Sequence, residues 1–195
     1  TTSIFGMKSL GINPANGKEL YLTPEGKVTY QWSAADQVII GDTEPKIRGS
    51  FGFNARWKQL SLFTSFLYRA GGQQYNPTLV SYVEDVNLLA TNADRRVNSM
   101  RWKNPGDVTQ FKGISENGYT TRPTSRFVQR DNLLQFNSVS LSYDVRPEII
   151  HKAGISMARI MASMQDLGYW STIHRERGLA YPFSRTFNFS VNLSF

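Results

Sequence analysis

The sequence contains no cysteine, two histidines and no long apolar run. The absence of cysteine excludes disulfide scaffolds, thiolate metal sites and a cysteine nucleophile. A helix that crosses a membrane needs about 20 consecutive apolar residues, and the absence of such a run excludes helical spans. It does not exclude a transmembrane barrel, because the strands of a barrel alternate in polarity. The N-terminal residues lack a methionine and a basic stretch followed by an apolar one. They are therefore no signal peptide, and we expect a mature product or a fragment.

Residues that carry catalytic chemistry are also scarce. His151 and His174 have no neighbours at the spacing of a metal site or a catalytic triad, and the sequence has no phosphate-binding glycine loop. The net charge of +7 is spread along the chain, and its longest basic runs are pairs such as Arg95–Arg96. We therefore predict no enzyme activity, no cofactor, no metal site and no nucleic-acid binding.

What the sequence does contain is period-two alternation, which is clearest at its end. Every odd position from Phe187 to Phe195 is apolar, and every even position from Thr186 to Ser194 is small and polar. A helix would scatter these residues around its circumference, whereas a strand sorts them onto two faces. The C-terminal residues are therefore predicted to form a strand with one apolar and one polar face.

Four further stretches alternate in the same way. Residues 47–57 and 135–145 are regular, 60–69 is interrupted by Phe63 and Leu67, and 155–167 is the least regular. Residues 58–59 form a tight turn between two of these strands, and Gly71–Gly72 is interpreted as a strand end. A local helix is expected around residues 79–89, and residues 1–45 show only turn signals.

The connections between these strands are alternately short and long. The connections at residues 58–59 and 146–154 are short, whereas those at residues 75–131 and 168–184 are long. Outer-membrane barrels have short periplasmic turns and long extracellular loops. If the C-terminus is periplasmic, both long connections lie outside the cell, which agrees with a barrel in the bacterial outer membrane.

The composition of the two faces also favours a barrel over a soluble sheet. The polar faces carry serine, threonine, asparagine and scattered arginine, and aromatic residues stand near strand ends at Trp57, Tyr68, Tyr143 and Phe195. Aromatic girdles at the lipid interface need this placement. Phe195 closes the last strand in phase, and such a strand is the recognition signal of the barrel assembly machinery, so we assign Phe195 that role.

Aromatic residues in the predicted loops are candidate ligand contacts, because flat rings stack on sugars or grip peptide side chains. The alternative is that these rings pack the loops onto one another. The candidates are Trp102, Tyr119, Tyr169 and Trp170.

Short motifs along the chain resemble a known family. Val139–Ser–Leu–Ser–Tyr143, Pro147, Gly154–Ile155 and Gln165–Asp166–Leu167 match its penultimate strands, and Tyr181–Pro182 with Arg185 and Phe195 match its closing strand. Upstream matches are Gly11–Ile–Asn–Pro–Ala–Asn–Gly17, Ile40–Gly41–Asp42 with Pro45–Lys46, and Arg101–Trp102 with Asn104–Pro105. In this order the motifs resemble the SusC/RagA-like TonB-dependent transporters. Asp166, Met164 and Ser190 depart from the usual residues of that family.

The resemblance implies an all-β, antiparallel transmembrane barrel of about 22 strands with a plugged lumen. Residues 1–195 would be the C-terminal part of the barrel and supply five or six strands, while the plug domain is absent from this chain. It further implies uptake of oligosaccharides or peptides energised through TonB. The expected partners are the rest of the barrel and plug, a SusD-like surface lipoprotein, the TonB complex acting through the plug, and outer-membrane lipid.

Two alternatives remain open at this point. One is another outer-membrane barrel, such as an adhesin or a porin, which would lack a plug domain and a TonB box. The other is a soluble β-sandwich that binds carbohydrate, since alternating strands also occur where one face of a sheet meets water. That alternative predicts that the 195 residues fold alone without detergent.

Overall fold

The computed structural model describes residues 1–87, 94–114, 120–174 and 184–195, which form two compact units. Unit 1 comprises Thr1–Glu44 and Gly72–Arg130, and unit 2 comprises Pro45–Gly71 and Asp131–Phe195. The structure is mostly strand, and the strands of its sheets pair antiparallel. The prediction of an antiparallel, mostly β chain is therefore confirmed.

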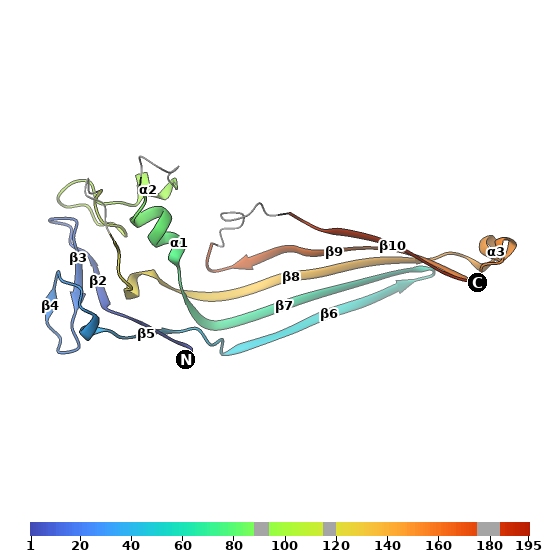
Figure 1. Cartoon of the computed structure of the whole chain (residues 1–195), viewed down its shortest axis with the longest axis horizontal. Coiled ribbons are helices and arrows are strands. Elements are labelled where there is room, and N and C mark those ends of the chain that lie inside the picture. Colours follow the sequence, from blue (N-terminus) through green and yellow to red (C-terminus); the bar gives the residue numbers. More distant parts are fainter. Residues whose placement is uncertain (88–93, 115–119, 175–183) are drawn as a thin grey trace. The chain divides into compact units, whose positions relative to one another are not determined.

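Unit 2 is built on one five-stranded sheet whose strands lie side by side in Figure 1. Its strands, in the order β6 to β10, are Ile47–Trp57, Leu60–Tyr75, Val128–Asp144, Met157–Ser171 and Phe187–Ser194. Each strand pairs with its neighbour in sequence, giving the order β10-β9-β8-β7-β6. All five predicted strands and the turn at residues 58–59 are confirmed, and β7, β8 and β9 are longer than predicted.

The register of this sheet sorts its side chains onto two faces. Residues directly opposite each other in neighbouring strands share a face, and Tyr143 opposes Ile160, which opposes Val191. One residue further along, Asp144 opposes Arg159 and Arg159 opposes Asn192, on the other face. The alternation read from each strand therefore aligns across strands into one apolar and one polar face.

A row of stacked rings crosses the apolar face. Phe51 stacks on Phe66 with ring centroids 5.1 Å apart, and Phe66 stacks on Phe136 at 4.6 Å. The β8–β9 pairing shifts register between Phe136 and Ser138, and Asp166 in β9 is left-handed with φ 52°. Across this irregularity β8 changes phase, because Phe136 lies on the apolar face although its parity is opposite to that of Tyr143. In β9, Gly168 keeps the parity of Ile160.

Two sequence interpretations in unit 2 were wrong. Gly71 does not end a strand: it lies inside β7 with φ 86°, a conformation that glycine adopts without strain. The second long connection does not begin at Gly168, because β9 continues to Ser171. Tyr169 and Trp170 are therefore strand residues and not loop residues. Both errors arose because a bulge or a kink breaks the alternation without ending the pairing.

Unit 1 contains strands where the sequence showed only turns. Two small sheets form there, one from β1 and β5 and one from β2, β3 and β4. The strands are Ser3–Gly6, Lys8–Ile12, Glu19–Leu22, Val28–Thr29 and Val38–Asp42. They are short, and the β1–β5 and β2–β3 pairings are interrupted by register shifts, which explains why no alternation was visible.

Short helical segments make up much of the rest. They are η1 (Ala34–Asp36), α1 (Pro77–Leu79), the π-helical η2 (Val80–Glu84), α2 (Arg96–Ser99), η3 (Ser125–Phe127), α3 (Pro147–Ile150) and η4 (His151–Ala153). The helix predicted around residues 79–89 corresponds to α1 and η2 as far as Glu84, and residues 88–89 lie outside the described part. The Asn76 side chain caps α1 by accepting hydrogen bonds from the backbone N–H groups of Thr78 and Leu79.

The apolar core of unit 1 forms where these helices meet the loops. Its buried members come from α1, η2, α2, η3 and the loop before Lys112, and they are Leu79, Val83, Val97, Phe111 and Phe127. The cluster joins segments that are up to 48 residues apart (127 − 79 = 48). Unit 1 thus has a core of its own, which supports the polar cluster beside it.

Gly52 provides a test of the β6–β7 pairing. A methyl group on its Cα would overlap the backbone carbonyl oxygen of Thr64, which cannot move without distorting the pairing. We expect Gly52→Ala to lower the free energy of unfolding by about 1–3 kcal/mol, measured by urea titration of the intact protein. Gly168→Ala is the matched control, because a Cβ at this other strand glycine meets nothing within 4 Å. Equal losses in the two variants would contradict the close approach at Gly52.

Candidate functional site

The most strongly organised polar feature of the chain is a buried cluster of charges in unit 1. The Arg126 guanidinium contacts the carboxylates of Glu19 and Glu84, at 2.8 Å and 2.6 Å for the shortest N···O pairs. It binds each carboxylate through two hydrogen bonds. Lys112 adds a second cation, with its Nζ 3.5 Å from Glu19 and 3.6 Å from Glu84. Two carboxylates and two cations therefore balance each other away from water.

The surroundings of Arg126 complete its coordination. Its guanidinium also donates to the Gln110 carbonyl oxygen at 2.6 Å and lies 4.4 Å from the centroid of the Phe127 ring. The Tyr21 hydroxyl donates to Glu19 at 3.2 Å. Bidentate arginine–carboxylate pairs are among the strongest polar contacts in proteins, because the planar fork matches the carboxylate. One guanidinium thus ties β3, η2 and the 110–112 loop to η3.

Electrostatics keeps Glu19 and Arg126 ionised. Burial alone would raise the pKa of Glu19, but the hydrogen bonds and the charge of Arg126, helped by Lys112, hold that pKa below its ordinary value. Burial would lower the pKa of Arg126, and the two carboxylates raise it instead. Burial and the negative charge of Glu19 raise the pKa of the Tyr21 phenol. Glu19 and Arg126 are thus held in their charged forms, which suits a structural role.

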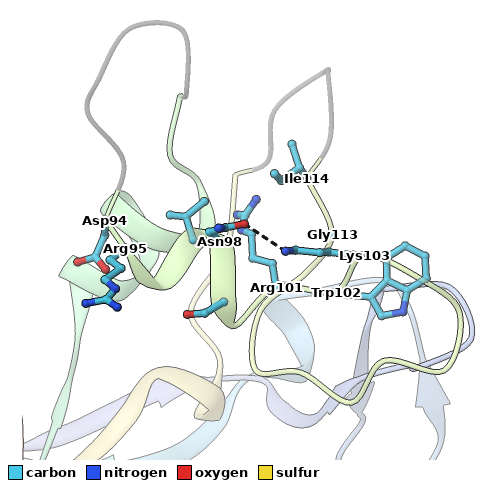
Figure 2. Close-up of a pocket in the computed structure, with 10 residues that line it drawn as sticks. Asp94, Arg95, Asn98, Arg101, Trp102, Lys103, Gly113 and Ile114 are labelled. Carbon is cyan, nitrogen blue, oxygen red and sulfur yellow. Dashed lines mark hydrogen bonds between the residues drawn. The ribbon is translucent and has the colours of Figure 1, made fainter.

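A hollow of about 790 Å³ lies elsewhere in unit 1, and Figure 2 shows the residues around it. It is lined by part of α2 and by the loop that follows it. Its charged lining residues are Asp94, Arg95, Arg101 and Lys103, and its apolar lining comes from Val97, Trp102 and Ile114. The volume falls within the range of about 300–1,000 Å³ that small-molecule sites occupy. This hollow is the candidate ligand site of the described chain.

Trp102, one of the predicted ligand contacts, lines this hollow but is held by the protein itself. Its indole N–H donates to the Pro14 carbonyl oxygen at 2.8 Å. A Cβ on Gly17 would stand 2.6 Å from the indole ring, and one on Gly113 would stand 3.0 Å from it. The ring therefore fastens the 13–17 turn to the 101–113 segment, and its contact with a ligand stays a prediction.

The other predicted contacts are not brought to this hollow. Tyr119 lies outside the described residues. Tyr169 and Trp170 belong to unit 2, where Tyr169 opposes Gln135 and Trp170 opposes Leu134. Phe136 opposes Gly168 on the apolar face, and Trp170 is two residues from Gly168. Trp170, 64% exposed, therefore lies on the apolar face, and its contact with a ligand stays a prediction.

The apolar face of unit 2 carries many of the exposed large apolar side chains of the described residues. Its most exposed residues are Ile47, Phe51, Phe53, Trp57, Trp170, Phe187, Phe189, Val191 and Phe195. Phe195 is 87% exposed and stands just beyond the end of β10. Contiguous exposed apolar surfaces in a folded protein mark contact with a partner or a membrane. None of the helices in the described ranges has the length and apolar character that a membrane crossing requires.

The residues of the buried cluster and of the hollow were mostly missed from the sequence. Glu19, Glu84 and Arg126 are far apart in the chain, and no spacing rule brings them together. Arg95 was noticed only as half of a basic pair. His151 and His174 join no metal site, since the described residues contain no group of three or more potential metal-ligating side chains.

Comparison with known proteins agrees with the motifs. No family model matches the chain. The chain is 26% identical over 162 residues to the TonB-dependent receptor P3 of Formosa agariphila, a match that covers 83% of this chain and 15% of that receptor. The resemblance to SusC/RagA-like TonB-dependent transporters is thereby confirmed.

Solved structures of RagAB share the fold. The RagAB peptide transporter matches with a TM-score of 0.79 and 22% identity. The RagAB peptide importer matches with a TM-score of 0.77 and 22% identity in its open-open state, and with 0.70 and 21% in its closed-closed state. Each match covers 99% of this chain but only 22% or 23% of the RagAB chain. The chain therefore spans less than a quarter of the proteins that it matches.

Removal of Arg126 tests whether the ion cluster holds unit 1 together. Arg126→Met would leave two buried carboxylates facing Lys112 alone, a loss that costs about 3–5 kcal/mol at such sites. We expect faster hydrogen exchange of backbone amides in residues 79–84 and 110–113 of the intact protein. Arg122→Met removes an exposed charge nearby and should leave exchange unchanged. Equal protection in wild type and Arg126→Met would contradict this role.

The depressed pKa of Glu19 sets a pH dependence. A carboxyl group whose folded pKa lies below its ordinary value of 4.5 stabilises the fold above that pH, and the stabilisation is lost as the pH falls through the folded pKa. We expect Glu19→Gln to reduce amide protection of unit 1 at pH 7. The difference from wild type should narrow below about pH 4.5, after correction for intrinsic exchange rates. A difference that is constant from pH 7 to pH 3 would argue against an ionised Glu19.

Proposed function

We propose that this chain, a relative of SusC/RagA-like TonB-dependent transporters, forms barrel wall and extracellular loops of a nutrient importer in the bacterial outer membrane. The observation that carries the proposal is the continuous exposed apolar face of unit 2, backed by a polar face on the same strands. A wall between lipid and an aqueous lumen requires this division. In a soluble sheet such a face would be buried against a second layer.

The polar face suits the lumen of the barrel. Serine and asparagine pair across it, as in the row Asn188, Ser163 and Ser140. Its charges are compensated near one end of the strands, where Asp144 lies 2.6 Å from Arg159 and 3.5 Å from Arg56. These polar side chains would face water and the globular domain that fills the lumen in this family.

The open edges of the sheet indicate further neighbours. Strands β6 and β10 each pair on one side only within the described sheet. Lipid does not tolerate unpaired backbone groups, so the remaining strands of a barrel of about 22 would pair there. In this arrangement the C-terminus is periplasmic, the long connections are extracellular, and Phe195 serves as the assembly signal.

Energy coupling and selection of the transported molecule would be properties of the complete assembly. Transport of an oligosaccharide or a peptide would be driven by the TonB complex acting on the plug domain, with a SusD-like lipoprotein covering the extracellular side. This assignment rests on the family resemblance and on the share of the fold held in common with RagAB. The chain itself would contribute wall and loops, with no enzymatic step.

Neighbouring residues on the central strand β8 test which face meets lipid. Leu141 is exposed on the apolar face, whereas Ser140 lines a hollow of about 330 Å³ on the polar face. We expect Leu141→Arg to lower the free energy of unfolding from phospholipid bilayers by about 2–4 kcal/mol, because it places a charge in hydrocarbon. Ser140→Arg, the matched control, should change it by less than about 1 kcal/mol, since the added side chain meets water.

The measurement is a urea titration of the intact protein folded into bilayers, followed by tryptophan fluorescence. Equal losses in the two variants, or a larger loss in Ser140→Arg, would overturn the assignment of the apolar face to lipid. A monomer that melts cooperatively in the absence of detergent would overturn the barrel altogether.

A further inference from the structure

The hollow in unit 1 is strongly basic for its size. Three of its lining residues, Arg95, Arg101 and Lys103, are cations, and Asp94 is the single acid among them. Asp94 is engaged by Arg96, whose side chain binds it through two hydrogen bonds at 2.6 Å and 2.8 Å. The charge of Asp94 is therefore compensated by Arg96, and cations outnumber acids three to one among the lining residues.

Two of these cations are exposed to an incoming ligand. Arg95 and Lys103 are both exposed, and neither forms an ion pair with any residue that the structure describes. Lys103 donates to the neutral Asn98 side chain at 3.1 Å, which holds its ammonium group beside the hollow (Figure 2). Figure 2 also shows Arg95 and Lys103 on opposite sides of Asn98.

The remaining lining decides between two kinds of anionic ligand. A carboxylate-bearing sugar would call for a free aromatic face, but Trp102 is packed against Gly17 and its N–H is bound to Pro14. The most exposed apolar side chain of the lining is aliphatic, since Ile114 is 61% exposed whereas Trp102 is half-buried. Aliphatic surface beside a guanidinium and an ammonium group matches the side chains and carboxylates of a peptide.

We propose that this hollow binds short acidic peptides, with Arg95 and Lys103 holding their carboxylates. Only the further step of treating the bound peptide as transported cargo rests on the proposed function. Because the binding groups are exposed charges, affinity should fall as the salt concentration rises.

The test is fluorescence anisotropy of a labelled tetraglutamate peptide with the intact protein in detergent. Tetraglutamine measures the contribution of charge, and trigalacturonate measures whether a sugar carboxylate is accepted. We expect saturable binding of tetraglutamate, and binding of tetraglutamine and trigalacturonate that is weaker by about tenfold or more. Arg95→Gln and Lys103→Gln should each weaken tetraglutamate binding about tenfold, as loss of a charge-assisted hydrogen bond does.

Lys27→Gln is the matched control, because it removes one exposed charge from unit 1 in the turn before β4 and does not line the hollow. It should bind tetraglutamate like the wild type, and amide exchange of unit 1 should be unchanged in all three variants. Absence of tetraglutamate binding, equal binding of tetraglutamine, preference for trigalacturonate, or equal losses in Lys27→Gln would each overturn the proposal. Peptide uptake by cells is measured separately. Binding without uptake would count against the importer alone, and uptake without binding would count against this site alone.

Discussion

The register of the five-stranded sheet is the constraint on which the two faces of unit 2 depend. Side chains in a strand alternate with a period of two, so a slip of one residue would exchange the apolar and polar faces. The tight turn at residues 58–59 fixes the β6–β7 register at one end. Between β8 and β9 the ion pair of Asp144 with Arg159 and the bulge at Asp166 do the same. Across the same irregularity β8 changes phase, which carries Phe136 to the apolar face, opposite Gly168 and two residues from the Leu134–Trp170 pair.

Unit 1 depends on a different interaction, the buried ion cluster around Arg126. Its strands are short and irregular, so no repeating pattern can hold its segments together. Instead, one guanidinium binds two carboxylates that lie 107 and 42 residues away in the chain. A buried charge without its partners costs far more than the complete cluster gains. The cluster therefore favours one arrangement of the loop segments over others, and the adjacent apolar core supplies the burial that stabilises it.

These two constraints agree with the two tasks of the proposed importer, which are to form a wall and to bind a ligand. A wall must present uniform apolar surface to lipid over its whole height, and repetition achieves this with little sequence information. A ligand site must place a few unlike groups together, which requires a unique packing of irregular segments. The hollow beside α2 arises from such packing: Trp102 joins two loops, and exposed basic side chains line the space around it.

The sequence by itself determined the strands of the sheet, their faces and the family resemblance, because alternation and short motifs are local properties. Both ends of the strand at residues 47–57 were predicted correctly, and the other strands of the sheet were predicted with shifted ends. The sequence could not reveal the small sheets of residues 1–45, the continuation of β7 through Gly71 or that of β9 through Trp170, since a bulge or a glycine kink interrupts the pattern without interrupting the hydrogen bonds. The tertiary structure alone decided the Arg126 cluster and the basic hollow. Their members meet only after the chain folds, and no local rule relates Glu19 to Arg126.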